Sequence, residues 1–281
     1  MARTPRGAMR AEVWTFEDGA IRSRRDALAH EEPLEIRLHA AGQRQTWGTT
    51  MRTPGHDFEL VAGTLFAEGI VQQLHDIVTM RYCVDSSVDG EQLYNVINVD
   101  LRADSLPDLS AQARHAAASS ACGICGRASI DDLRRECAPL PSGFAVSPEV
   151  ICALPEVLRP AQAAFSATGG LHAAALFSAD GELLALREDI GRHNALDKLV
   201  GWALLNRRLP LHETVLCVSG RIGFEIAQKA IRAAIPVVAA ISAPSSLAVR
   251  TAHAFDLTLV GFIRDRRFNI YSAPQRIIGM A

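Results

Sequence analysis

The spacing of hydrophobic and polar positions along the chain changes near residue 168. Before that point, alternating stretches are mixed with stretches in which apolar residues recur every three or four positions. Extended segments are expected at residues 11–16, 33–39, 45–52, 77–84 and 93–101. Helices are expected at residues 57–68, where Gly69 ends the pattern, and near 128–136 and 148–158. The first half therefore predicts an α+β arrangement.

Beyond residue 168, short apolar strands alternate regularly with helices. Asp180 and Gly181 lie between two extended segments, 171–177 and 182–187, and predict a hairpin. A helix at 193–206 comes next. It is followed in turn by strand 215–218, helix 223–234, strand 237–241, helix 245–254 and strand 257–262. Such an alternation is typical of a parallel sheet with right-handed crossovers, so the second half predicts an α/β fold.

A stretch of small residues separates these two patterns. Residues 106–109 include a proline, and residues 116–121 are all alanine or serine, which is typical of a linker. We therefore divide the chain into an α+β N-terminal domain (1–115), a linker with a cysteine pair (116–145) and an α/β domain that binds a cofactor (146–281).

Composition places the chain among ordinary globular proteins, since it has 281 residues, 48% of them hydrophobic, and a net charge of -2. It has no overall positive charge that would attract nucleic acid or anionic lipid. No apolar run approaches the roughly 20 residues of a membrane span, and the first residues lack the apolar part of a secretory signal. The sequence therefore predicts a cytoplasmic protein that binds neither nucleic acid nor membranes.

Lysine is scarce in this chain. Arginine accounts for all but two of the 29 basic residues, as a genome rich in G and C would favour, and the two lysines are Lys198 and Lys229. Both lie in motifs described below. Because an ammonium group is a compact point charge that a guanidinium cannot copy, both are candidates to neutralise charge on a ligand.

Only Cys122 and Cys125 of the six cysteines form a motif, Cys-Gly-Ile-Cys-Gly. Two thiols at this spacing can share a disulfide, a metal ion or a sulfur atom, and the glycines allow a second molecule to approach closely. A zinc site needs four ligands, so Cys137 and His115 would have to complete it. A thioredoxin-like pair should follow a strand directly, whereas a linker precedes this one. We therefore favour sulfur chemistry in a loop, with zinc as the alternative.

Three connections that follow strands of the predicted parallel sheet carry residues suited to an anion. Ligands of such sheets bind beyond the carboxyl ends of the strands. Backbone N–H groups at a helix start and arginine side chains both favour phosphate. The candidate residues are Ser219, Gly220 and Arg221, with Lys229 on the helix that follows, then Ser242, and finally Phe262, Ile263, Arg264, Asp265, Arg266 and Arg267. None of these connections matches a P-loop or a dinucleotide fingerprint, so an ordinary nucleotide enzyme is not expected.

Two further segments are more polar than structure alone requires. The first opens the helix near residue 193 and contains Asp189, His193, Asn194, Asp197 and Lys198. A cap needs only one or two such groups, and the alternative is a charged, exposed first turn. The second contains Thr168, Gly169, Gly170 and His172, for which the alternative is a plain turn followed by a structural histidine.

Together, the motifs CGICG, TGGLH, EDIGRHNALDK, SGRIGFEIAQKA and GFIRDRRFNIYS resemble, in this order, the FdhD/NarQ family of formate dehydrogenase accessory sulfurtransferases. The resemblance runs from about residue 32 onward. It implies a sulfurtransferase that accepts persulfide sulfur from a cysteine desulfurase and passes it to the bis-molybdopterin guanine dinucleotide form of the molybdenum (or tungsten) cofactor, for formate dehydrogenase. It implies that Cys122 carries the persulfide, that Cys125 is its partner thiol, and that residues 262–267 bind the cofactor, which a guanine nucleotide would mimic.

The resemblance also implies a homodimer and a C-terminal domain like cytidine deaminase, a three-layer α/β fold. Deaminases hold zinc through His-x-Glu and a later Pro-Cys-x-x-Cys, but here the cysteine pair comes first and Ala174 stands in place of the glutamate after His172. Deamination is therefore not expected. Gly223 stands where the family more often has serine, which removes one hydroxyl. The alternatives are a non-catalytic cofactor chaperone with structural zinc at the cysteine pair and a thiol–disulfide oxidoreductase, for which the sequence suggests no peptide groove.

Overall fold

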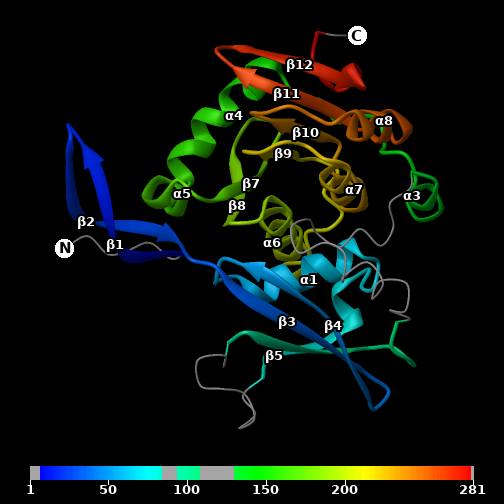
Figure 1. Ribbon diagram of the computed structural model, residues 1–281. Helices are drawn as coiled ribbons and strands as arrows, with labels where there is room; N and C mark the ends of the chain where they lie inside the picture. Colours follow the sequence, from blue (N-terminus) through cyan, green and yellow to red (C-terminus); the bar gives the residue numbers. More distant parts are fainter. Residues whose placement is uncertain (1–6, 84–93, 108–129, 280–281) are drawn as a thin grey trace.

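The computed structural model describes residues 7–83, 94–107 and 130–279 of the chain. Its strands form a two-stranded, a four-stranded and a six-stranded sheet. Figure 1 shows that α1 and α6 lie between the two larger sheets and that α4 lies on the far side of the six-stranded one. The arrangement is therefore a mixed α/β fold in layers, as the sequence predicts.

The four-stranded sheet contains β3 (Glu32–Ala40), β4 (Gln43–Arg52), β5 (Ile77–Tyr82) and β6 (Val96–Leu101), in the order β4-β3-β6-β5. Alternate residues of β3 are buried against α1 (Asp57–Ala67), which presents its apolar side to them. This period of two is what the sequence pattern indicates for a strand with one buried face. The short 3-10 helix η1 (Leu74–Asp76) leads into β5.

A hairpin of β1 (Ala8–Glu17) and β2 (Ala20–Ala29) projects from the body of the protein (Figure 1). Its turn is Asp18-Gly19, and both residues have positive φ, as a two-residue hairpin turn requires. The sequence analysis finds β1 but misses β2, because exposed and half-buried positions alternate through the middle of β1, whereas β2 contains a run of five exposed residues and no alternation. The Asp18-Gly19 pair is the sequence signal that could have indicated this hairpin.

The six-stranded sheet has the order β12-β11-β10-β9-β7-β8. Its strands are β7 (His172–Phe177), β8 (Leu183–Asp189), β9 (Val215–Val218), β10 (Val237–Ala240), β11 (Thr258–Arg264) and β12 (Arg267–Ser272). The three central strands β9, β10 and β11 are parallel, while β7 is antiparallel to both β9 and β8. The predicted parallel core and the predicted hairpin at Asp180-Gly181 are both confirmed. The likeness to cytidine deaminase stays a prediction.

Helices cover both faces of this sheet. One face carries α6 (Arg192–Leu205), α7 (Phe224–Arg232) and α8 (Ser246–Ala254), and the other carries α4 (Pro148–Ala161). Smaller helices are α3 (Ile130–Glu136), α5 (Ala163–Thr168), which the sequence analysis misses, and the 3-10 helix η3 (Pro274–Arg276). No helix in the described ranges is long and apolar enough to cross a membrane.

The third predicted connection, expected as a loop at residues 262–267 after a strand that ends at residue 262, is a tight hairpin, which corrects that expectation. Strand β11 continues to Arg264, and the chain returns directly as β12. Asp265 and Arg266 form the turn, with φ of 50° and 61°. Arg267 and Asn269 of β12 are exposed, and the strand directly follows two exposed charged residues, so sequence analysis treats its start as part of one polar connection.

The two larger sheets are joined where α1 crosses α6. A Cβ atom on Gly63 would lie 1.9 Å from the carbonyl oxygen of Asp197, and one on Gly201 would lie 1.8 Å from that of Glu59. The two helix backbones therefore touch, which only glycine permits. The boundaries at residues 115 and 145 stay a prediction, but this crossing gives the two halves a tightly packed contact.

Candidate functional site at the carboxyl edge of the sheet

Strand pairing brings several predicted site residues to one edge of the six-stranded sheet. The parallel strands β9 and β10 end there, and Ser219 and Ser242 follow them. Because β7 is antiparallel to β9, it begins at the same edge with His172, which pairs with Asp189 at the end of β8. Residues that lie up to 70 positions apart in the sequence, such as His172 and Ser242, thus reach the same edge.

Backbone contacts lock the connections of this edge together. Ile222 and Pro244 form a parallel bridge, and the N–H of Ser245 donates to the carbonyl of Ile222 at 2.9 Å. The N–H of Phe262 donates to the carbonyl of Ser242 at 3.2 Å. The edge is therefore one continuous backbone surface formed by three segments.

Ser219 and Gly220 shape the centre of the edge. The N–H of Ala173 donates to the Ser219 hydroxyl at 2.9 Å, which ties β7 to the end of β9. A Cβ atom on Gly220 would lie 3.3 Å from Nδ1 of His172. The glycine thus allows the imidazole to lie close against the backbone, and Arg221 beside it is exposed.

Two helices begin at this edge without a side-chain cap. The N-cap residues of α6 and α7 are Gly191 and Gly223, whereas the Ser245 hydroxyl accepts a hydrogen bond from Ala248 N at the start of α8. The first N–H groups of a helix lack partners within it and carry partial positive charge. The starts of α6 and α7 are therefore suited to an anion.

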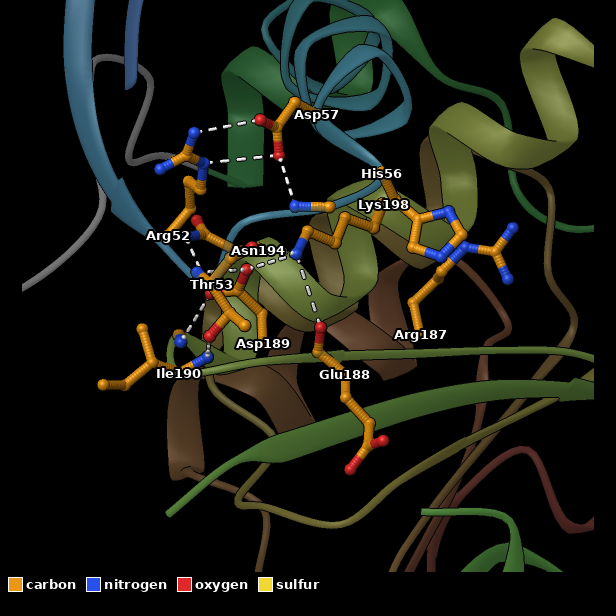
Figure 2. A network of polar contacts seen from close by, with 12 residues as sticks. Arg52, Thr53, His56, Asp57, Arg187, Glu188, Asp189, Ile190, Asn194 and Lys198 are labelled. Atoms are coloured by element: carbon orange, nitrogen blue, oxygen red, sulfur yellow. Dashed lines mark hydrogen bonds and ion pairs between the residues drawn. The ribbon is translucent and has the colours of Figure 1, made fainter. Parts of the chain in front are cut away.

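The Asp189 carboxylate is fully buried and binds groups from both halves of the chain (Figure 2). One oxygen accepts from Thr53 N at 3.1 Å and lies 2.7 Å from Lys198 Nζ. The other accepts from Gly191 N at 2.9 Å and from Asn194 Nδ2 at 3.1 Å. Lys198 Nζ also donates to the Thr53 carbonyl at 2.8 Å. These predicted site residues are thus tied to each other and to the N-terminal half.

Asp197, which directly precedes Lys198 on α6, forms a second buried pair with Lys229 of α7. Both carboxylate oxygens lie 2.5 Å from Lys229 Nζ, and the Thr64 hydroxyl donates to one of them at 3.2 Å. Burial raises the pKa of Asp197, although the Lys229 ammonium opposes this. Both lysines of the chain therefore have a carboxylate partner inside it, and the expectation that they neutralise cofactor charge stays a prediction.

The pKa values of His193 and His172 are both lowered at this edge. His193 is mostly buried, and its Nε2 has no hydrogen-bond partner among the described residues. The nearest carboxylate oxygen, on Glu225, is 3.8 Å away. Burial, assisted by Lys229 and Arg192, lowers the pKa of His193 to about 4 although Glu225 opposes the shift. Burial and Arg192 also lower the pKa of His172.

Arg192 is a residue of this edge that the sequence analysis does not select. It is half-buried at the first position of α6, and its Cβ lies 3.9 Å from the point where a Cβ of Gly220 would be. Within the described ranges it makes no salt bridge. Its position in the motif between Asp189 and His193 could have indicated a role in the site. From the sequence alone, however, an arginine at a helix start looks like an ordinary solvent-exposed charge.

The hairpin end at residues 262–267 extends past the end of β10 and is mostly exposed. Phe262 is 45% exposed and has φ of 54°, an uncommon backbone angle for an aromatic residue. Ile263 is buried beneath it. Arg264 pairs with Asp265 at 2.9 Å, and Arg266 and Arg267 are also exposed. Three guanidinium groups are thus available to solvent here.

Thr168, Gly169 and Gly170 form the end of α5 just before β7. Gly169 has φ of 68°, and the Thr168 hydroxyl donates to the Ala164 carbonyl at 2.8 Å. The N–H of Gly170 donates to the Thr168 hydroxyl at 3.3 Å. This geometry is that of a helix C-terminus, and a contact with a ligand stays a prediction.

Cys122 and Cys125 lie outside the described residues, as does His115, which the zinc alternative needs. Of the other cysteines, Cys83 and Cys217 are buried, and Cys137 and Cys152 are half-buried. No group of three or more His, Cys, Asp or Glu side chains in the described part of the chain is placed to hold a metal ion.

Comparisons with known proteins agree with this organisation. The model of the FdhD/NarQ family matches residues 29–278. The "Sulfur carrier protein FdhD" of Nocardia farcinica is 49% identical over 272 residues, which cover 96% of this chain and 94% of that protein. The protein of the same name from Streptomyces coelicolor is 49% identical over 273 residues, 95% of each chain.

One solved structure is also similar. It is described as the crystal structure of a formate dehydrogenase accessory protein from Desulfotalea psychrophila, and it matches with a TM-score of 0.74 at 24% identity. The match covers 96% of this chain and 99% of that chain. At this identity the likeness shows the fold alone.

Proposed function

From the premise that the chain belongs to the FdhD/NarQ family, we propose that it is a sulfur carrier that serves formate dehydrogenase. The observation that carries this proposal is 49% identity, over almost the whole chain, to proteins named sulfur carrier. The sulfur comes from the persulfide of a cysteine desulfurase. Its destination is the bis-molybdopterin guanine dinucleotide form of the molybdenum or tungsten cofactor, which is the substrate of the transfer.

Loading is a thiol exchange at Cys122. Its thiolate attacks the outer sulfur of the desulfurase persulfide, the sulfur–sulfur bond of the donor breaks, and the donor cysteine leaves as a thiolate. The product is a persulfide on Cys122. One sulfur atom moves and no net oxidation occurs, so loading needs no further reactant.

Release uses the second thiol of the pair. The thiolate of Cys125 attacks the inner sulfur of Cys122, the outer sulfur leaves as hydrosulfide for the metal centre, and a Cys122–Cys125 disulfide forms. The two electrons that reduce the persulfide sulfur to sulfide come from the sulfur atoms of Cys122 and Cys125, which are oxidised to the disulfide. A dithiol reductant of the cell then restores both thiols.

The carboxyl edge of the six-stranded sheet supports docking of the cofactor. Its guanine nucleotide carries phosphates, which suit the uncapped starts of α6 and α7 and the exposed guanidinium groups of Arg221, Arg264 and Arg266. The exposed ring of Phe262 offers a face on which a base can stack. The buried pairs beneath hold this edge in place, since they connect α6 to α1 and to the segment after β4.

We also infer that the protein is a homodimer, because two-fold dimers are the commonest soluble assembly. We infer as well that it is cytoplasmic. Sedimentation of the purified protein at several concentrations tests the dimer. A single species with the mass of one chain at all concentrations would contradict it.

The sulfur-carrier proposal is tested by intact mass measurement after incubation with a cysteine desulfurase and cysteine. We expect one added sulfur atom on the wild-type protein and on the control Cys137→Ala. Cys122→Ala should gain none at this segment. Equal loading of Cys122→Ala would contradict the assignment, and stoichiometric zinc in the purified protein would favour the chaperone alternative.

A further inference from the structure

A cavity of about 400 Å³ lies at the amino edge of the six-stranded sheet, opposite the candidate site described above. It is lined by Leu176 near the end of β7, Leu184 near the start of β8 and Trp202 of α6. Thr214, which directly precedes β9, also lines it, and the antiparallel pairing of β7 with β9 brings these residues to one edge. Its volume is within the range of cavities that bind small molecules. The cavity is therefore a second place for a ligand, separate from the carboxyl edge.

The inner part of this cavity is apolar. Leu176 is fully buried, whereas Leu184 and Trp202 pack against the same core cluster and remain partly exposed. Partly exposed apolar side chains gain free energy when a ligand covers them and removes them from water. The inner part therefore suits an aliphatic or aromatic group of a ligand.

The rim of the cavity carries charged side chains. Arg208, His212 and Glu213 line it and are exposed. The guanidinium of Arg208 lies over the ring of Trp202, with its Cζ atom 5.2 Å from the ring centroid. Within the described ranges, neither Arg208 nor Glu213 forms a salt bridge. Both charges are therefore available to a ligand.

The segment that supplies the rim is held by hydrogen bonds to the body of the protein. The N–H of Arg208 donates to the carbonyl of Ala203 at 2.8 Å. The N–H of Leu211 donates to the carbonyl of Ala233 at 2.9 Å, and the Thr214 hydroxyl donates to the carbonyl of Leu211 at 2.9 Å. The rim is therefore formed before a ligand binds, which lowers the entropic cost of binding.

The two charges of the rim select the kind of ligand. An anion would be attracted by Arg208 and repelled by Glu213, and a cation would meet the reverse. A ligand with a negative and a positive group is attracted by both side chains. The simplest such ligand that also has an apolar group is an α-amino acid with an apolar side chain.

We propose that this cavity binds a free α-amino acid with an apolar side chain. The side chain lies against Leu184 and Trp202, the carboxylate accepts hydrogen bonds from Arg208, and the ammonium group donates to Glu213. A volume of about 400 Å³ corresponds to roughly thirteen molecules of liquid water, which suits a ligand of about a dozen non-hydrogen atoms such as phenylalanine. This site does not depend on the proposed function.

The test is titration of L-phenylalanine, and of the smaller L-leucine, followed by calorimetry and by the NMR signals of the tryptophan indole N–H groups. We expect L-phenylalanine to bind with a dissociation constant of about 1 mM or tighter. The change should be confined to the indole signal of Trp202, which the variant Trp202→Phe identifies by its loss. 3-Phenylpropionate lacks the ammonium group and phenethylamine lacks the carboxylate, so each should bind at least about threefold more weakly.

Variants of the rim test which group of the ligand each charge holds. Glu213→Gln should weaken L-phenylalanine by about threefold to fivefold but strengthen 3-phenylpropionate, because it removes a repulsive charge. Arg208→Gln should weaken both ligands. The control Arg207→Gln alters a neighbouring exposed arginine that does not line the cavity, and it should bind both as wild type does.

The possible results separate the ligand class from the place of binding. Equal affinity of wild type for L-phenylalanine and 3-phenylpropionate, or an equal effect of Glu213→Gln on both, would overturn the assignment of an amino acid. A change in another tryptophan signal, or no saturable binding of L-phenylalanine or L-leucine, would overturn the cavity as the site. Neither result bears on sulfur loading at Cys122, so failure of this proposal and failure of the proposed function are distinguishable.

Discussion

At the scale of single residues, Asp189 is the centre of the site. Its carboxylate holds the ammonium of Lys198, the side chain of Asn194 and backbone N–H groups of Thr53 and Gly191. Removing one member of a buried ion pair leaves an uncompensated charge, which is strongly destabilising. These residues therefore fix the turn between β8 and α6, and through it the positions of Arg192 and His193.

The neutrality of His193 can be tested through stability. Its pKa is lowered from 6.5 to about 4 in the folded protein, first by burial and then by Lys229 and Arg192. As the pH falls from 6.5 towards about 4, the unfolded chain takes up a proton at this residue and the folded chain does not, so the free energy of unfolding decreases. Replacement by glutamine removes this contribution.

We therefore expect denaturant unfolding at a series of pH values to show a shallower loss of stability for His193→Gln than for wild type in that window. Identical slopes for the two proteins would show that the imidazole titrates normally. This measurement needs no ligand, so its outcome is independent of nucleotide binding.

Sequence analysis locates most residues of the edge but not what each of them does. It selects Lys198 and Lys229 because lysine is rare, yet both are held by aspartates that lie nearby only in the fold. It passes over Arg192, because the partners that set a free guanidinium apart from a paired one are distant in sequence. The register of β7 against β8 and β9, and not the local pattern, brings His172 to the same place.

At the scale of elements, the crossing of α1 and α6 is the contact that joins the two sheets. A methyl group on Gly63 would lie 1.9 Å from a carbonyl oxygen of α6, which belongs to the backbone and cannot move aside. We expect Gly63→Ala to lower the free energy of unfolding by roughly 3 kcal/mol. In an exposed helix the same change would stabilise by about 1 kcal/mol, because alanine favours helix.

Thermal and denaturant unfolding of Gly63→Ala check this expectation, and the sign of the change in stability relative to wild type decides the outcome. A melting temperature equal to or above that of wild type would mean that the helices do not touch at this glycine.

The elements that sequence analysis finds and misses differ in burial. Strands β9 and β10 consist entirely of buried apolar residues, so their limits in the sequence are clear. Strands β2 and β12 lie at sheet edges and have no run of buried apolar residues, so their backbone pairing defines them. Missing β12 also affects the description of the candidate site. The connection expected to be a loop is a hairpin, in which Arg264 and Arg267 lie on strands and Arg266 lies in the tight turn.

At the scale of the whole molecule, the cysteine pair lies, along the sequence, between the residues that form the four-stranded sheet and those that form the six-stranded sheet. Residues 96–101 belong to the four-stranded sheet, while Leu133 and Leu140 pack in the core beside the six-stranded one. Arg276 donates to the carbonyls of Leu140 and Pro141 and so fastens the chain after the pair. The described residues before and after the segment with Cys122 and Cys125 thus belong to the four-stranded sheet and to the core beside the six-stranded sheet, respectively.

Transfer of labelled sulfur from loaded protein to the guanine dinucleotide cofactor tests most directly whether the cysteine pair and the sheet edge act together. We expect wild type and the control Arg44→Ala, which alters an exposed arginine of β4, to load and transfer alike. Arg264→Ala should load fully, because Cys122 is intact, but transfer about tenfold less at limiting cofactor, since one charge-assisted contact to the cofactor is lost. Transfer by Arg264→Ala at the wild-type rate would contradict the account.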